Sequence, residues 1–194
     1  MLTPTFACSR AAVVTCITLL CGACSSTQTT RTTTTTGTPR AGAPAPTAAP
    51  STRLADAVED VFARTNAARR SNGMTALTRS QNLMSAAQLQ ADQMAQTGVF
   101  EHEIPQAQYP TLKSRLAAVQ YEMRAAGENI AEGQRDAAEA LSTWMSSAGH
   151  RGNILSRDYS ELGTGVALGR NGRLYWVQVF GRPARAAATR TRLR

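Results

Sequence analysis

The chain has 194 residues with 21 basic and 13 acidic side chains, which gives a formal net charge of +8. Between positions 54 and 183, twelve arginines and Lys113 balance all 13 acids, so the excess charge belongs to the two ends of the chain. A nucleic-acid-binding domain carries its basic patch on the folded part. The charge distribution therefore predicts no nucleic-acid partner.

The chain begins with a segment typical of export. Arg10 is the only charged residue before an apolar run over positions 11–23. This run is too short to span a bilayer as a helix, but it has the length of a signal-peptide core. We therefore predict a signal peptide over residues 1–23 and export of the remainder.

All four cysteines lie at positions 8–24, so the sequence predicts no disulfide in the rest of the chain. Residues 19–26, Leu-Leu-Cys-Gly-Ala-Cys-Ser-Ser, resemble a bacterial lipobox, although Cys21 stands where Leu is usual. The resemblance implies cleavage before Cys24 and a diacylglycerol on its thiol, which would anchor the protein at the cell envelope. Ser25 and Ser26 resemble the signal of lipoproteins sent to an outer membrane. The alternative is ordinary secretion with Cys24 unmodified.

Two segments are predicted to lie outside the folded domain. Residues 24–53 form a Thr/Pro-rich tether, because this stretch has 11 Thr and no aromatic residue with which to build a core. Residues 184–194 form a basic tail that includes Arg185, Arg190, Arg192 and Arg194. Such a tail either contacts anionic lipid or acidic polymers or is a solvated end without a partner. The folded domain is predicted over residues 54–183.

Four segments have apolar residues at the spacing of amphipathic helices. We predict these helices over residues 54–71, from 78–80 to 97, over 111–119 and over 137–147, with Asp136 as the N-cap of the last.

The pattern then changes to that of strands. Residues 162–168 and 173–180 flank Gly169-Arg170-Asn171-Gly172, and an Asn-Gly turn between strand-like runs predicts a hairpin. Residues 121–130 supply a further strand. This order of helices and strands indicates an α+β layered domain with a small antiparallel sheet.

Seven motifs occur in a specific order. They are Asn66-Ala67-Ala68-Arg69, His102, Gly127-Glu128-Asn129-Ile130, Trp144, Gly149-His150-Arg151-Gly152-Asn153-Ile154-Leu155, Gly163-Thr164-Gly165-Val166 and Tyr175-Trp176-Val177-Gln178-Val179-Phe180. In this order they resemble the bacterial CAP (or SCP) domain, of the family of cysteine-rich secretory proteins, antigen 5 and plant pathogenesis-related proteins. The resemblance covers about residues 54–181. It implies a CAP-like α-β-α sandwich, in which helices cover a three-stranded antiparallel sheet with a central cleft.

The resemblance also implies a divalent-metal site. In many animal members two His and two Glu line the cleft, and the histidines can hold zinc or another divalent cation. His102, Glu128 and His150 match three of these positions, but Trp144 is not followed by the fourth, a glutamate three residues later. Two imidazoles and one carboxylate still make a zinc site with an open position. His102, Glu128 and His150 are therefore the candidate metal ligands, and Glu128 is the candidate catalytic base.

Each of these residues also has a structural interpretation. His102 between two glutamates fits a surface loop, His150 directly after a helix fits the negative end of its dipole, and Glu128 fits a carboxylate that accepts backbone amides. A second polar set, predicted to be buried and to stabilise the fold, consists of Asn66, Arg69, Asn153 and Gln178.

The residue types present exclude several classes of enzyme active site. No histidine lies four residues after His102, as a zinc-protease helix requires, and no cysteine follows Cys24 to act as a thiol nucleophile. The serines near His150 lack a Gly-x-Ser-x-Gly context.

Three functions remain open. We favour a noncatalytic, envelope-anchored module that binds lipid, envelope polymer or protein. The first alternative is a metal-assisted hydrolase that uses the same cleft, with Glu128 as base or ligand. The second is a structural spacer within the envelope.

Overall fold

The computed structural model describes residues 50–184. The predicted signal peptide, Cys24, residues 24–49 of the predicted tether and residues 185–194 of the tail lie outside the described residues. In the described range, no helix combines the length and the apolar character needed to cross a bilayer.

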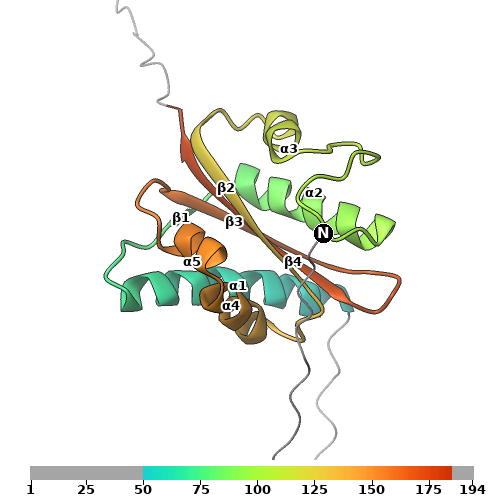
Figure 1. Cartoon of the computed structure of the whole chain (residues 1–194), viewed down its shortest axis with the longest axis horizontal. Helices are drawn as coiled ribbons and strands as arrows, with labels where there is room; N and C mark the ends of the chain where they lie inside the picture. The colour runs from blue at the N-terminus through green and yellow to red at the C-terminus, as the bar shows by residue number, and fades with distance from the viewer. Residues whose placement is uncertain (1–49, 185–194) are drawn as a thin grey trace, which may run out of the picture. The chain divides into compact units, whose positions relative to one another are not determined.

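Helices cover both faces of one sheet (Figure 1). The strands are β1 (Thr78–Arg79), β2 (Met123–Glu132), β3 (Glu161–Leu168) and β4 (Leu174–Pro183), in the order β1-β3-β4-β2. One face carries α2 (Gln81–Thr97) and α3 (Leu112–Ala118), and the other carries α1 (Pro50–Ser71), α4 (Ala137–Ser146) and α5 (Ala148–Leu155). The predicted α+β sandwich is therefore confirmed. Its three long strands are antiparallel, as predicted, and β1 adds a short fourth strand parallel to β3.

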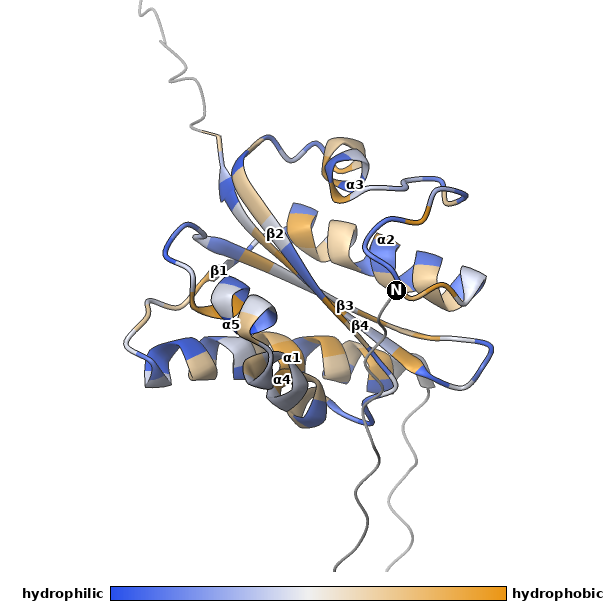
Figure 2. Ribbon diagram, viewed as in Figure 1, coloured by the Kyte–Doolittle hydropathy of each residue, from blue (hydrophilic) through white to orange (hydrophobic). Residues whose placement is uncertain are grey.

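The alternation of side chains along β4 creates two cores. Tyr175, Val177 and Val179 belong to the core beneath α2 and α3. Trp176 and Phe180 belong to the core beneath α1, α4 and α5, where both are fully buried. Hydrophobic residues gather on the strands and on the helix faces turned toward them, whereas the tip of the β3–β4 hairpin is hydrophilic (Figure 2). Each face of the sheet thus buries its own apolar layer.

Two glycines of β3 bring α2 close to the sheet. A Cβ atom at Gly163 would overlap the backbone of Leu83, and one at Gly165 would lie 2.5 Å from the carbonyl carbon of Ala87. The buried residues of α2 include three small ones, Ala86, Ala87 and Ala91. Helix and sheet therefore meet through backbone contact, which fixes the position of α2.

The ends of the helices largely follow the local sequence signals. Asp136 caps α4 by accepting a hydrogen bond from the Glu139 amide, and Gly98 ends α2 at φ +72°, a conformation that favours glycine. Thr111 and Ser114 form a capping box at the start of α3. Helix α1 begins at Pro50, four residues before the predicted domain start at 54.

Two short elements differ from the sequence-based expectation. Thr78 and Arg79 form β1 instead of the first turn of a helix, because the amides of Thr78 and Ser80 bond to the carbonyls of Ser160 and Leu162. The motif that begins at Gly149 is itself helical and makes up most of α5. The helix-breaking glycines at positions 149 and 152 conceal this helix in the sequence.

Candidate functional site

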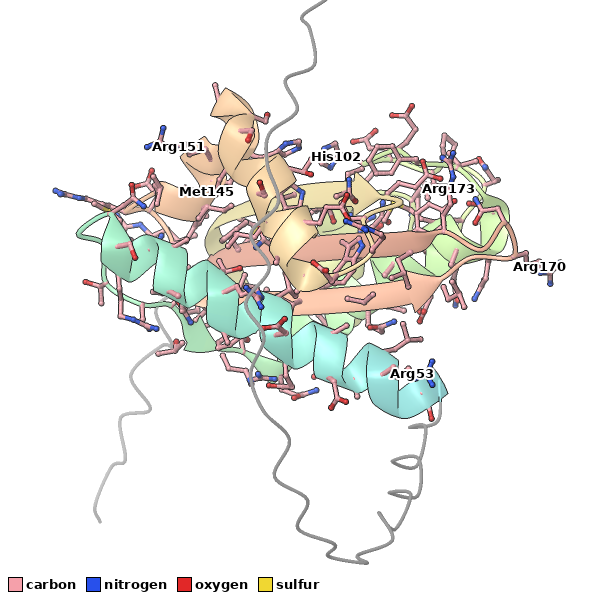
Figure 3. All side chains as sticks on the ribbon, turned by 90° about the horizontal axis from the view of Figure 1, so that it is seen from below. Arg53, His102, Met145, Arg151, Arg170 and Arg173 are labelled. Carbon is pink, nitrogen blue, oxygen red and sulfur yellow. The ribbon has the colours of Figure 1, made fainter. Side chains whose placement is uncertain are left out.

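The candidate residues gather around β2, which is the edge strand of the sheet. Ile130 faces the core under α2 and α3, whereas Ala131 faces the core under α4 and α5. By the same alternation, Glu128 points toward the α2/α3 layer and Asn129 toward the α5 layer. His102 lies in the loop after α2 (Figure 3). His150 lies at the start of α5, which covers the other face of the sheet. The site therefore draws on both helical layers.

Glu128 is held by two partners at once. Its Oε1 accepts a hydrogen bond from His102 Nδ1 at 2.9 Å, and its Oε2 accepts one from Arg115 Nη2 at 2.6 Å. The Glu128 side chain is 4% exposed and that of Arg115 is 0% exposed, whereas that of His102 is 53% exposed. Successive hydrogen bonds thus link a buried cation, a buried carboxylate and an imidazole at the surface. We call Arg115, Glu128 and His102 the His102 relay.

The charges of this relay explain the properties of His102. Its hydrogen bond to Glu128 raises the pKa of the His102 imidazole above 6.5, and burial only partly opposes this effect. Because Nδ1 donates to Glu128, the Nε2 atom is the ring nitrogen left for other partners. The Arg115 guanidinium is fully buried, and Glu128 is its counter-ion. Its Nε and Nη1 have no hydrogen-bond partner in the described part of the chain.

His150 has a different environment. Burial lowers the pKa of the His150 imidazole, and the positive charge of His102 lowers it further. Its Nδ1 is buried without a hydrogen-bond partner among residues 50–184. The His150 backbone carbonyl accepts a hydrogen bond from Asn129 Nδ2 at 3.0 Å, which fixes α5 against β2.

A chain of hydrogen-bonded side chains lies beneath the site, and all are buried except Asn153, which was predicted to be buried but is half-buried. Asn153 Nδ2 donates to Asn129 Oδ1 at 2.9 Å, Asn129 Nδ2 donates to Gln178 Oε1 at 3.0 Å, and Gln178 Nε2 donates to Thr65 Oγ1 at 2.6 Å. These side chains come from α5, β2, β4 and α1 in turn. We call the four residues the amide chain. Its geometry is that of a structural network that joins four elements.

Asn66 and Arg69 fix the end of α1. Asn66 exchanges two hydrogen bonds with the backbone of Leu77, at 2.7 and 3.0 Å. Arg69 donates to the carbonyls of Thr75, Ile154 and Ser156. Both side chains therefore bind backbone groups of neighbouring loops and lie outside the His102 relay.

These contacts limit the number of side chains that are free to bind a metal ion. In residues 50–184, no three His, Cys, Asp or Glu side chains are grouped to hold a metal ion. Both Glu128 oxygens are engaged, so the geometry leaves two imidazoles as donors, one fewer than the three protein ligands of a catalytic zinc site. Metal binding by His102, Glu128 and His150 stays a prediction.

The sequence analysis missed Arg115 as a functional residue. It lies in the predicted short helix, and nothing in the local pattern distinguishes it from a solvent-facing arginine. Only the tertiary structure, which brings Arg115 of α3 to Glu128 of β2, identifies its partner.

Comparisons with known proteins agree with this architecture. The model of the cysteine-rich secretory protein family (CAP) matches residues 62–180. The uncharacterized protein YkwD of Bacillus subtilis (strain 168) is 31% identical over 136 residues, which cover 70% of this chain and 51% of that protein. The uncharacterized membrane protein YlbC of the same organism is 34% identical over 116 residues, covering 60% and 32%. The chain thus spans about half or less of the length of these relatives.

Solved structures share the fold. An extracellular protein containing an SCP domain, from Bacillus anthracis str. Ames, matches with a TM-score of 0.61 and 29% identity, over 66% of this chain and 41% of that chain. An outer surface protein from Borrelia burgdorferi matches with a TM-score of 0.60 and 15% identity, over 66% and 94%. At that identity, the second match is a likeness of fold alone.

Proposed function

Since the chain belongs to the cysteine-rich secretory protein (CAP) family, we propose that it is an exported binding module of the cell envelope and not an enzyme. The signal-peptide pattern over residues 1–23 supports export, and the lipobox-like sequence supports a membrane anchor at Cys24. The similar Bacillus anthracis protein, which is described as extracellular, supports export as well.

The observation that carries the noncatalytic assignment is the engagement of Glu128. A general base needs an oxygen that can reach the proton it removes. Glu128 has one oxygen on Arg115 and the other on His102, and its side chain is 4% exposed. The carboxylate therefore orients His102 and compensates Arg115, and each of its oxygens already has a hydrogen-bond partner.

A groove elsewhere on the domain offers the ligand surface. It has a volume of about 720 Å³ and lies between the start of α1, the start of α4 and the β3–β4 hairpin. Figure 3 shows Arg53, Arg170 and Arg173 together at this end of the molecule. The apolar lining consists of Leu54, Ala57, Leu168, Leu174 and Trp176, with Arg53, Arg135, Asp56, Asp60 and Asp136 also lining it. Small-ligand sites have volumes of about 300–1,000 Å³ and few polar groups, so an acyl chain with a polar head fits this groove.

The test is a titration of hexadecanoic acid, below its critical micelle concentration, into the full chain. Leu168 is 54% exposed, so Leu168→Glu places a charge on the groove without disturbing the core. We expect at least a tenfold loss of affinity in this variant and none in His102→Ala. Met123→Glu is the matched control, because Met123 is an exposed apolar residue outside the groove. Equal affinity in all variants would reject the groove as the binding site.

The alternative of a metal-assisted hydrolase is supported by one contact. A carboxylate that binds Nδ1 of a histidine orients its Nε2 toward a metal ion in many metalloproteins, and His102 has this arrangement with Glu128. Here Zn²⁺ is titrated calorimetrically into the full chain and into its His102→Ala and His150→Ala variants. One-site binding that both substitutions abolish, together with hydrolysis that a chelator stops, would favour the hydrolase.

A further inference from the structure

The second buried arginine, Arg69, has an unusual set of partners. Its Nε donates to the carbonyl of Thr75 at 2.8 Å, and its Nη1 donates to the carbonyls of Ile154 at 2.6 Å and Ser156 at 2.9 Å. These contacts use the Nε–H and both Nη1–H bonds. All three acceptors are neutral, and the residue is only 3% exposed.

The charge of Arg69 therefore lacks a counter-ion. In the described part of the chain no carboxylate forms an ion pair with it, in contrast to the pair between Arg115 and Glu128. Burial accordingly lowers the pKa of the Arg69 guanidinium. Its Nη2 makes no hydrogen bond to any residue of the range 50–184, yet it is not among the buried polar atoms without a partner. The two Nη2–H bonds consequently remain available to a partner from solvent.

The open side of Arg69 faces a cavity. A hollow of about 400 Å³ lies at the C-terminal end of α1 and is lined by Arg69, Gly73, Met74, Thr75, Arg157 and Tyr159. Gly73, at φ +71°, turns the chain here. Arg157 contributes an exposed second guanidinium, which also has no ion pair in the described residues. The cavity shares no lining residue with the acyl groove or with the His102 relay.

We propose that this cavity binds a phosphate group. Two guanidinium charges match the two negative charges of a phosphate monoester, whereas a single carboxylate would neutralise only one of them. Guanidinium groups bind phosphate oxygens through several N–H bonds at once. The neighbouring acid Asp158 does not line the cavity and forms no ion pair with Arg69 or Arg157 in the described residues. Phosphate supplies the acceptor for Arg69 Nη2 and the counter-ion that the described residues do not.

The test presents phosphate in two forms, one soluble and one on a lipid headgroup. The first arm titrates sodium phosphate, and then glycerol 3-phosphate, calorimetrically into the full 194-residue chain at low ionic strength. The second arm measures binding of the chain to vesicles of phosphatidic acid in phosphatidylcholine, against vesicles of phosphatidylcholine alone. Saturable binding in the first arm alone assigns a soluble ligand, and phosphatidic-acid-dependent binding assigns a headgroup. Either result supports the site only if Arg157→Gln weakens it, because the basic tail of the full chain offers anionic vesicles a second contact.

Arg157→Gln is the decisive variant, because Arg157 is exposed and its loss leaves the buried contacts of Arg69 intact. Arg170→Gln removes the same charge from the β3–β4 hairpin, at the end of the molecule that carries Arg53 (Figure 3). We expect at least tenfold weaker phosphate binding in Arg157→Gln and unchanged binding in Arg170→Gln. Equal weakening in both variants, or no saturable binding in either arm, would overturn the proposal.

Discussion

Two arginines are buried in this domain, and they are compensated in opposite ways. Arg115 has a carboxylate partner, Glu128, but leaves two of its nitrogens without hydrogen bonds in the described residues. Arg69 has three carbonyl partners but no carboxylate. The first arginine is neutralised within the protein and closed to solvent, whereas the second is well bonded and still carries net charge toward a cavity.

The two buried arginines therefore have different structural roles. An internal ion pair costs much to desolvate and then fixes the geometry of its members, which here orients His102 through Glu128. A guanidinium bonded to backbone carbonyls holds loops together, and its remaining charge stays available to an external anion. Two substitutions test this distinction: one replaces Glu128, the partner of Arg115, and the other replaces Arg69 itself.

The largest effect is expected for Glu128→Gln. This substitution keeps the shape of the side chain but leaves the Arg115 charge buried and uncompensated, which costs about 3–5 kcal/mol of unfolding free energy. Urea denaturation of the full chain measures the change. The double variant Arg115→Met/Glu128→Gln removes the charge as well and should recover most of the loss. A single variant as stable as the wild type would show that Glu128 does not compensate Arg115.

A smaller loss is expected for Arg69→Met. The methionine fills part of the volume but leaves the carbonyls of Thr75, Ile154 and Ser156 without their donor, at a cost of about 2–3 kcal/mol. The same denaturation measurement applies. Because Arg69 has no carboxylate partner, no second substitution at an acidic residue should rescue it, in contrast to the Arg115 pair.

The third prediction concerns pH. The pKa of His102 is raised by its hydrogen bond to Glu128, so protonated His102 stabilises the fold fully below pH 6.5 and loses this contribution as the pH rises through its folded-state pKa. Because the side chain is 53% exposed, solvent limits the contribution to below about 1 kcal/mol. Unfolding with EDTA present, from pH 5.5 to pH 8, should show the stability advantage of wild type over His102→Gln shrinking.

His150 provides the opposite control in that experiment. Its lowered pKa means that protonation favours the unfolded chain, so the stability of the wild type relative to His150→Gln should fall as the pH drops below 6.5. Parallel pH profiles for both variants would contradict the assigned environments.

The smallest effect is expected for Arg64→Gln. Arg64 pairs with Asp60 one helical turn away at 2.8 Å, but both side chains are 45% exposed. Solvent and salt screen such a pair. Its denaturation midpoint should therefore differ little from that of the wild type, and added salt should remove the difference. A loss of stability comparable to that of Arg69→Met would show that burial is not the reason why Arg69 and Arg115 contribute more to stability than the exposed Arg64.

Much of the fold was predictable because its signals are local. The apolar spacing of α1, α2 and α4, the Asp136 cap and the Asn171-Gly172 turn each act within a few residues. Strand β1 and helix α5 were not predicted, because β1 depends on pairing with β3 and α5 contains two glycines. Tertiary contacts override weak local preference in both cases.

The site was predictable only in part. The motifs indicated His102, Glu128 and His150, and the structure places them around one edge strand. The sequence could not show that both oxygens of Glu128 are occupied, since this depends on how α3 packs against β2. Likewise, Arg69 was predicted as a buried polar residue, but its open Nη2 depends on loops that lie 85 and 87 residues away in the chain.

The amide chain of Thr65, Gln178, Asn129 and Asn153 limits which parts of the domain can unfold locally. It joins α1, β4, β2 and α5 through successive side-chain hydrogen bonds, so no one of these elements can detach without exposing polar groups of the others. Backbone amides in these four elements should accordingly exchange with solvent deuterium only through a shared, global opening. Helix α3 lies outside the amide chain, but its Arg115 is paired with Glu128 of β2, so its opening also requires that buried ion pair to break.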